Sequence, residues 1–164
     1  RARLPHPVAA VVFDFDGVFT DDGVLVTQQG DEAVMCSRRD GMGIELLRKS
    51  GILMCVISKE QVPIVMHRCE KLQLEAMHGI NDKLSLLRKW LDRRGADSRN
   101  TVYVGNDVND IECMDFVGCS VAPNDAHPAA LERADIVLSA GGGKGAVREL
   151  ADLICDNSPD RQKP

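Results

Sequence analysis

Two aspartates, Asp14 and Asp16, lie two residues apart where an apolar run of the sequence ends. The run covers residues 9–15 (AAVVFDF), and Gly17 follows the second aspartate. Side chains at this spacing share one side of an extended chain, and two partly buried carboxylates repel each other unless a cation or hydrogen bonds compensate. The pair therefore predicts a site for a hard cation such as Mg²⁺. The alternative is an ordinary acidic turn, because Asp and Gly are frequent turn residues.

Three features further along the chain carry groups that could act with this pair. Ser58 ends the apolar run 52–57, and its hydroxyl with neighbouring backbone N–H groups could hold a phosphate oxygen. Lys83 lies in the first turn of a predicted helix, where the helix dipole disfavours a cation that has no anionic partner. Asp107, in the segment GNDVND, falls at a strand end like Asp14 and suits a hard cation. Taken singly, Ser58 could be a plain strand-end serine and Lys83 a solvated lysine.

The elements that must position these groups alternate along the chain. Short apolar runs typical of buried strands alternate with amphipathic helical segments, which predicts an α/β fold with a doubly wound parallel sheet. Functional groups of such a sheet lie at the carboxyl ends of its strands. Strands are expected at residues 9–15, 52–57, 74–77, 101–104, 119–121 and 136–138. Helices are expected at residues 41–50 with Asp40 as N-cap, 63–72, 82–94, 108–116, 128–133 and 146–154.

The chain leaves no room for a separate cap domain over the site. Two alternating segments around Gln29-Gly30-Asp31 predict a β-hairpin insert at about residues 23–37. Only 41 residues separate Asp16 from Ser58, and 24 separate Ser58 from Lys83. We expect one domain over residues 1–164, in which the insert holds a hairpin and no more.

Composition restricts the class of protein. The chain has 25 acidic and 20 basic residues, a net charge of −5, and no basic cluster, so nucleic acid is not an expected partner. No run of about 18 apolar residues predicts a membrane span, and the N-terminal stretch lacks a signal-peptide cleavage site. The six cysteines show no metal-binding spacing, which predicts free thiols in a reducing, cytoplasmic environment.

Four of these segments, taken in order, resemble the motifs of the haloacid dehalogenase superfamily: DFDGVFTD, the Ile57-Ser58 strand end, the helix-opening Lys83 and GNDVND. The stretches RRDGMGIELLRKSGI and GGGKGAVREL are similar to the branch typified by 3-deoxy-octulosonate 8-phosphate phosphatases. They are similar also to C-terminal domains fused to some CMP-sialic acid synthetases. The resemblance implies a Rossmann-like core and a Mg²⁺-dependent phosphatase.

The resemblance also implies a role for each motif residue. Asp14 would be the nucleophile that forms an aspartyl-phosphate, and Asp16 the acid and then the base. Mg²⁺ would be held by the Asp14 and Asp107 carboxylates, the Asp16 backbone carbonyl, a phosphate oxygen and waters. Ser58 and Lys83 would bind phosphate oxygens. Two neighbours would support the metal ligands, namely Asn106 and Asp110.

The sugar end of the substrate has several candidate contacts, namely Thr20, Arg39, Asp40, Gly41, Glu60, Arg68 and Lys144. Arginine matches a sugar carboxylate bidentately, although each charged residue here could equally be a plain surface group. The octulosonate phosphatases that the chain resembles usually read T-G-R where it reads Ser58-Lys59-Glu60. This departure favours a nine-carbon keto-acid sugar phosphate, a nonulosonate 9-phosphate, over the eight-carbon substrate.

A site without a cap must exclude water by other means. The resembled branch does so by forming a homotetramer in which a neighbouring subunit lines each pocket, and we expect the same here. A monomer whose hairpin folds over its own site is the alternative. A competing function is a non-catalytic oligomerisation domain, as in the synthetase-fused relatives of vertebrates. Those domains tend to lose the catalytic carboxylates, whereas Asp14, Asp16, Lys83 and Asp107 are all present, which favours the enzyme.

Overall fold

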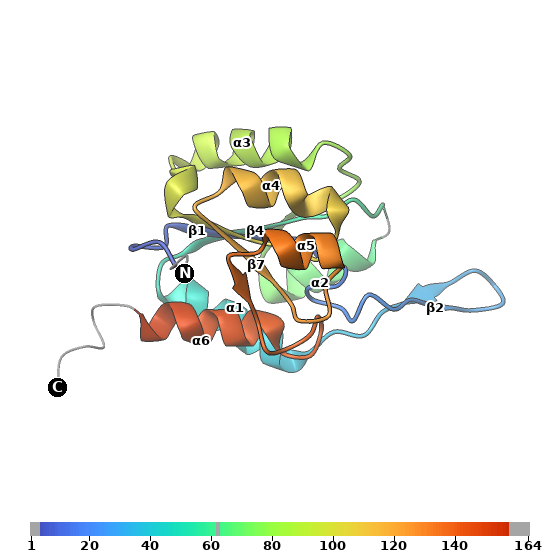
Figure 1. Cartoon of the computed structure of the whole chain (residues 1–164). Coiled ribbons are helices and arrows are strands. Elements are labelled where there is room, and N and C mark those ends of the chain that lie inside the picture. The colour runs from blue at the N-terminus through green and yellow to red at the C-terminus, as the bar shows by residue number, and fades with distance from the viewer. Residues whose placement is uncertain (1–3, 62, 158–164) are drawn as a thin grey trace.

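A six-stranded parallel sheet forms the centre of the computed structural model, which describes residues 4–61 and 63–157. The strand order is β5-β4-β1-β6-β7-β8 (Figure 1). The strands are β1 (Ala10–Phe13), β4 (Leu53–Ile57), β5 (Glu75–Met77), β6 (Thr101–Val104), β7 (Cys119–Ala122) and β8 (Ile136–Val137). Because β1 lies between β4 and β6, the strand order reverses there, and ligands of such sheets bind at this crevice. The predicted doubly wound α/β class is confirmed, and the described residues contain no cap domain.

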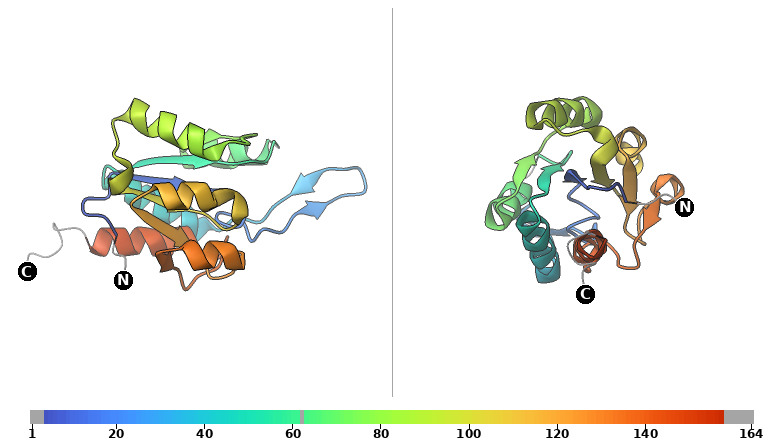
Figure 2. Two further views of the ribbon diagram at one scale, coloured as in Figure 1. Left: turned by 45° about the horizontal axis from the view of Figure 1, so that its top comes forward. Right: turned by 90° about the vertical axis from the view of Figure 1, so that its left-hand side faces the viewer.

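Helices cover both faces of the sheet, as the end-on view in Figure 2 shows. One face carries α1 (Arg38–Lys49), α2 (Ile64–Leu72) and α6 (Ala146–Asp156), and the other carries α3 (Lys83–Arg94), α4 (Ile111–Phe116) and α5 (Pro128–Arg133). An apolar core lies on each face of the sheet, and the side chains of β1 point alternately into the two cores. Val11 and Phe13 pack on the α1–α6 side, and Val12 packs on the α3–α4 side. Truncating Phe13 to Ala would lower the free energy of unfolding by about 3–5 kcal/mol. The strand that precedes Asp14 is therefore firmly packed in the core.

Helix α1 begins earlier than predicted. Its N-cap is Ser37, whose hydroxyl accepts a hydrogen bond from Arg39 N at 3.1 Å, so the prediction of Asp40 as N-cap is wrong. Asp40 lies in the first turn, and its carboxylate instead accepts a hydrogen bond from Arg148 N at 3.1 Å. Asp40 thereby supports the N-terminal turn of α6, where a negative charge is favourable.

The predicted helix 108–116 is divided in two. A 3₁₀ turn, η2 (Val108–Asp110), precedes α4 because the Asp110 side chain turns back to accept from Asp107 N at 3.3 Å. Helix α3 has Asp82 as its N-cap, accepting from Ser85 N at 2.9 Å. The remaining strand and helix ends differ from the prediction by at most two residues, which is within the usual uncertainty of element ends.

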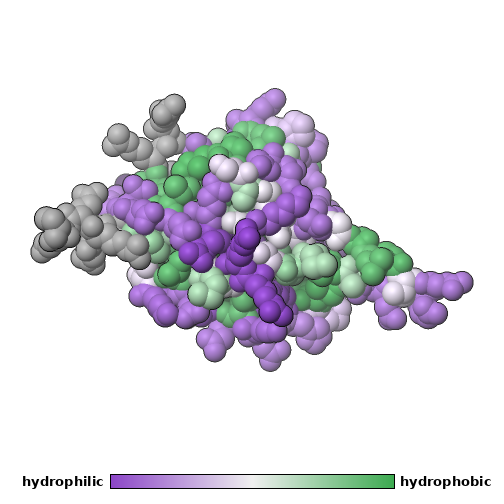
Figure 3. Space-filling model, turned by 90° about the horizontal axis from the view of Figure 1, so that it is seen from below, coloured by the Kyte–Doolittle hydropathy of each residue, from purple (hydrophilic) through white to green (hydrophobic). Residues whose placement is uncertain are grey.

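The predicted hairpin is confirmed, but it forms a two-stranded sheet of its own. Strands β2 (Leu25–Val26) and β3 (Glu32–Ala33) pair antiparallel, and Gly30 adopts φ +90° in the turn. The hairpin projects from the body of the molecule (Figures 1 and 2). Its exposed apolar side chains form the green area at the right of Figure 3, namely Val24, Leu25, Val26 and Met35. Such a surface is costly in water unless another chain covers it.

Candidate active site

A small cavity of about 150 Å³ opens at the carboxyl ends of β1, β4 and β6. The residues that line it come from the loops after these strands: Asp14, Asp16, Asp22, Ser58, Lys59, Glu60, Asn106, Asp107 and Asn109. The structure therefore brings together the motif residues of three separate segments, as their strand-end positions predicted.

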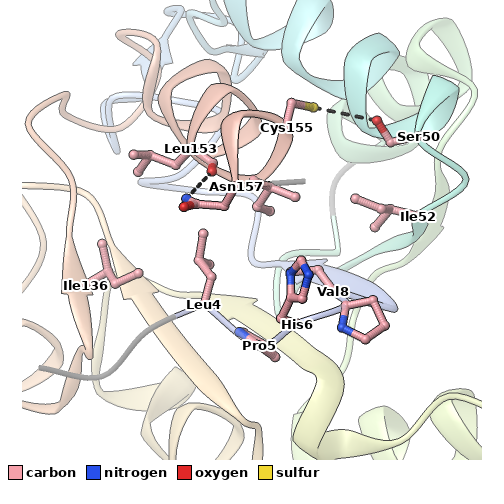
Figure 4. A pocket seen from close by; sticks show the side chains of 12 residues that line it. Leu4, Pro5, His6, Val8, Ser50, Ile52, Ile136, Leu153, Cys155 and Asn157 are labelled. Atoms are coloured by element: carbon pink, nitrogen blue, oxygen red, sulfur yellow. Dashed lines mark hydrogen bonds between the residues drawn. The ribbon is translucent and has the colours of Figure 1, made fainter. Parts of the chain in front are cut away.

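A larger cavity of about 840 Å³ lies at the opposite, amino end of the sheet. Figure 4 shows that its walls come from the segment before β1, from Ile52, from Ile136 and from the last turn of α6. Its lining is mainly apolar, and none of the described residues that line it is an aspartate or a glutamate. The larger cavity therefore lacks the carboxylates that a hard cation needs, and the smaller one, which has them, is the candidate active site.

Asp14 is held rigidly at the end of β1. Its backbone N donates to Val104 O at 2.8 Å, and its Oδ1 accepts from Phe15 N at 2.7 Å and from Lys83 Nζ at 2.9 Å. Burial raises the pKa of the Asp14 carboxyl to about 8, and the Asp110 charge adds to this effect, against the opposing charge of Lys83. A nucleophilic carboxylate must be ionised, so the site requires positive charge in addition to Lys83.

Lys83 lies between two carboxylates and is 4% exposed. Its Nζ is 2.9 Å from Asp14 Oδ1 and 2.8 Å from Asp110 Oδ1. Burial alone lowers the pKa of Lys83, but the two carboxylates outweigh burial and raise it, so the side chain stays cationic. An ammonium group has three donors, which leaves one N–H for a phosphate oxygen.

Asp110 orients Lys83 from behind the cavity. It is fully buried and accepts hydrogen bonds from Tyr103 OH at 2.8 Å and from Asn106 N at 2.9 Å, besides that from Lys83. The role of Tyr103 was not predicted from the sequence. A signal was present, because a tyrosine inside a fully buried strand needs a partner for its hydroxyl, and a nearby carboxylate is a frequent one.

Asp16 has the environment of a proton donor. Burial raises the pKa of its carboxyl, and the charges of Glu60 and Asp22 add to this effect. Thr20 donates to Asp16 Oδ1 at 3.4 Å and accepts from Gly17 N at 3.1 Å. Thr20 is fully buried and supports the Asp16 loop, and its assignment as a sugar contact stays a prediction. A carboxyl group with a raised pKa can stay protonated near neutral pH and act as a general acid.

The oxygens around Asp14 suit a hard cation. Asp14 Oδ2 and the Asp16 carbonyl converge on the Asn106 amide, whose nitrogen reaches them at 3.2 Å and 2.9 Å when the amide is turned to donate. Asp107 lines the same cavity. Within residues 4–61 and 63–157, no three His, Cys, Asp or Glu side chains converge as a metal site by themselves. A cation here therefore needs the Asp16 carbonyl beside the two carboxylates, a mixed oxygen set that Mg²⁺ accepts.

The predicted sugar contacts are only partly at the cavity. Glu60 lines it, and the Glu60 N donates at 3.2 Å to the Oγ of Ser58, the residue predicted to bind a phosphate oxygen. Asp40 is fully buried against α6, whereas Gly41 is partly exposed and lines a separate groove beside Leu72. Neither residue lines the cavity, and their assignment as sugar contacts stays a prediction.

Three further candidates lie away from the cavity within the single chain. Arg68 donates to Ser37 O at 3.0 Å beneath the start of α1. Arg39 and Lys144 line a separate groove beside α6, and Lys144 Nζ lies 3.6 Å from Asp125 Oδ2. A sugar contact by any of the three would require a neighbouring subunit, and their role stays a prediction.

A pair of aspartates in a cavity at the carboxyl edge of a parallel sheet indicates a hydrolase. The family of haloacid dehalogenase-like hydrolases matches residues 56–149. The chain is also 35% identical over 148 residues to 3-deoxy-D-manno-octulosonate 8-phosphate phosphatase KdsC of Escherichia coli (strain K12), an alignment that covers 90% of this chain and 79% of that protein. The chain belongs to the haloacid dehalogenase-like hydrolase family. Within it the chain falls in the KdsC-like phosphatase branch and is a phosphoric monoester hydrolase.

Solved structures show the same fold. A putative HAD family hydrolase from Streptomyces avermitilis superposes with a TM-score of 0.92 at 43% identity, covering 95% of this chain and 91% of that one. The 3-deoxy-D-manno-octulosonate 8-phosphate phosphatase of Moraxella catarrhalis, solved with magnesium ion, phosphate ion and a KDO molecule, gives a TM-score of 0.89 at 25% identity, covering 93% and 88%. Among the described residues of the present chain, no helix has the length and apolar character of a membrane span.

Proposed function

We propose that this phosphatase hydrolyses a keto-acid sugar phosphate with Mg²⁺ as cofactor, through an aspartyl-phosphate on Asp14. The observation that carries the proposal is the geometry of Asp14: one carboxylate oxygen is held by Lys83 at 2.9 Å, while the other faces the cavity wall shared with the Asp16 carbonyl. The names of the KdsC relatives and the magnesium and phosphate bound in the Moraxella protein support it.

The chain's own groups can carry out both the transfer of the phosphoryl group to Asp14 and the hydrolysis of the aspartyl-phosphate. Asp14 attacks phosphorus; as the bond to the sugar oxygen breaks, the Asp16 carboxyl group gives that oxygen its proton. The Asp16 carboxylate then takes a proton from a water that attacks the aspartyl-phosphate, which releases phosphate and restores Asp14. Lys83 and Ser58 hold phosphate oxygens throughout. Mg²⁺ bound by Asp14, Asp107 and the Asp16 carbonyl would compensate the negative charge of the site.

Glu60 supports a nine-carbon substrate. It lines the cavity and raises the pKa of Asp16, so a negative charge stands where the resembled octulosonate phosphatases usually carry arginine. A carboxylate can accept hydrogen bonds from a polyol or amide tail but repels a sugar carboxylate placed close to it. The octulosonate 8-phosphate remains the second candidate, because the curated relatives act by name on it.

The active form is a homotetramer whose subunits complete one another's sites. The cavity holds few groups that could bind a sugar, and the hairpin exposes Val24, Leu25, Val26 and Met35. A second copy that covers this surface would remove apolar area from water and close the cavity. The six cysteines, all among the described residues, are free thiols, which is consistent with a cytoplasmic location.

A phosphate-release screen tests the function directly. The wild-type chain is incubated with octulosonate 8-phosphate, nonulosonate 9-phosphates and unrelated sugar phosphates, with Mg²⁺ or with a chelator. We expect release only with Mg²⁺ and highest with a keto-acid sugar. Equal rates on all sugar phosphates, or full activity in chelator, would contradict the proposal.

A further inference from the structure

The glycine-rich segment 141–143 packs directly on the loop that carries Asp16. Gly143 N donates to Val18 O at 3.0 Å, and a Cβ added to Gly142 would lie 2.1 Å from Gly17 O. Gly143 itself has φ +64°, a conformation that glycine adopts without strain. The contact is backbone against backbone, so a side chain at Gly142 would displace the Asp16 loop.

Asp125, in the loop between β7 and α5, holds this segment in place. Its Oδ1 accepts from Gly142 N at 2.8 Å, and a Cβ added to Gly141 would lie 2.3 Å from its Oδ2. The ammonium group of Lys144 lies 3.6 Å from Asp125 Oδ2. A hydrogen bond from a backbone N–H to an ionised carboxylate is stronger than one between neutral groups. Glu149 holds the preceding residues by accepting from Ser139 N and Ala140 N, and Asp125 holds the glycine that presses on the Asp16 loop.

The opposite side of the same loop lies against the cavity. A Cβ added to Gly17 would lie 1.9 Å from Asn106 Nδ2, and Gly17 has φ +73°. The loop is thus held between Asn106 on one side and Gly142 on the other. Asn106 belongs to the site already described, whereas Gly142 and Asp125 do not line the cavity.

We propose that Asp125 and Gly142 are positioning residues for the reaction, holding the loop so that the Asp16 carboxyl group reaches the oxygen that leaves phosphorus. The inference rests on the proposed function, in which Asp16 donates that proton. A sugar alkoxide needs a proton as the bond breaks, whereas p-nitrophenolate is stable without one. Displacing Asp16 therefore lowers the rate of hydrolysis of the sugar phosphate more than that of p-nitrophenyl phosphate.

The test compares kcat/KM for the two substrates, since this constant reports the formation of the phosphoenzyme. Asp125→Ala removes the acceptor for Gly142 N, and Asp125→Asn keeps an oxygen there. We expect Asp125→Ala to lower kcat/KM about tenfold for the sugar phosphate and about twofold or less for p-nitrophenyl phosphate. Asp125→Asn should restore most of the loss, and Asp16→Asn should show the same substrate dependence in stronger form.

Asp115→Ala is the matched control, because Asp115 is an exposed carboxylate that pairs with Arg133 at 3.4 Å; it should change neither constant. Gly142→Ala should reproduce the Asp125→Ala pattern, and if it does not fold, the Asp125 pair decides. An equal loss for both substrates, no loss, or no restoration by Asn would overturn the inference. A wild-type chain that releases no phosphate from either substrate would instead contradict the proposed function.

Discussion

Removing the Asp14 charge should stabilise the metal-free fold. Burial and the Asp110 charge raise the pKa of Asp14 from 3.8 to about 8. At about 1.4 kcal/mol per pH unit, this difference means that ionising Asp14 costs the folded chain about 5–6 kcal/mol. Asp14→Asn removes that cost, in which the favourable contact of the carboxylate with Lys83 is already included. The expectation is a free energy of unfolding that is higher by several kcal/mol at pH 8 without divalent cations.

The sign of the pH dependence follows from the direction of the pKa change. Asp14 binds its proton more tightly in the folded chain than in the unfolded chain, so wild-type stability falls as pH rises from 3.8 towards about 8. The Asn variant lacks this contribution, and the difference between the two should shrink as pH falls towards 4. Added Mg²⁺ should stabilise the wild type more than the variant, because it binds the folded site.

Urea unfolding monitored by circular dichroism, at pH 5 and pH 8 with chelator or Mg²⁺, measures the stability difference between variant and wild type, its dependence on pH and the response of each protein to Mg²⁺. Asp115→Asn is the control: its exposed pair with Arg133 should contribute about 1 kcal/mol or less. If Asp14→Asn shows the same pH dependence and the same Mg²⁺ response as the wild type, the reasoning about charge in this site is wrong.

Three further expectations concern substrate, positioning and assembly. Glu60→Arg should lower kcat/KM for a nonulosonate 9-phosphate and raise it for octulosonate 8-phosphate, each by about 1–3 kcal/mol. Glu60→Gln is the control, because it removes the Glu60 charge that raises the pKa of Asp16 without adding a positive charge. An unchanged ratio of the two kcat/KM values would show that Glu60 does not select the substrate. Tyr103→Phe removes one hydrogen bond to Asp110 and should lower kcat severalfold with little change in KM; an unchanged kcat would show that Lys83 is oriented without it. Leu25→Asp in the exposed hairpin should reduce the tetramer in ultracentrifugation, whereas a wild-type monomer would refute the assembly.

The order of the catalytic motifs predicted how the site comes together. Asp14, Ser58 and Asp107 follow three strands, and parallel strands bring their carboxyl ends to one edge, so their meeting at one cavity was predictable. Lys83 was expected to have an anionic partner because it opens a helix, but that Asp14 is this partner, at 2.9 Å, is known only from the structure.

Contacts between distant loops were not predictable in this way. The Asp40 side chain supports a helix 108 positions further along the chain, at Arg148, although its place before the helix expected at residues 41–50 had predicted an N-cap. The contact of Gly142 with Gly17 likewise depends on how two loops pass each other. Periodicity reports which face of an element is buried, and it contains no information on which loop covers which.

The central claim is that Asp14 receives the phosphoryl group. Rapid mixing with a keto-acid sugar phosphate and Mg²⁺, followed by acid quenching, proteolysis and mass spectrometry, locates any transferred phosphate. We expect a phosphorylated peptide that contains Asp14, which accumulates in Asp16→Asn because the base for its hydrolysis is missing. We expect neither phosphopeptide nor phosphate release in Asp14→Asn. Substantial phosphate release by Asp14→Asn would contradict the account.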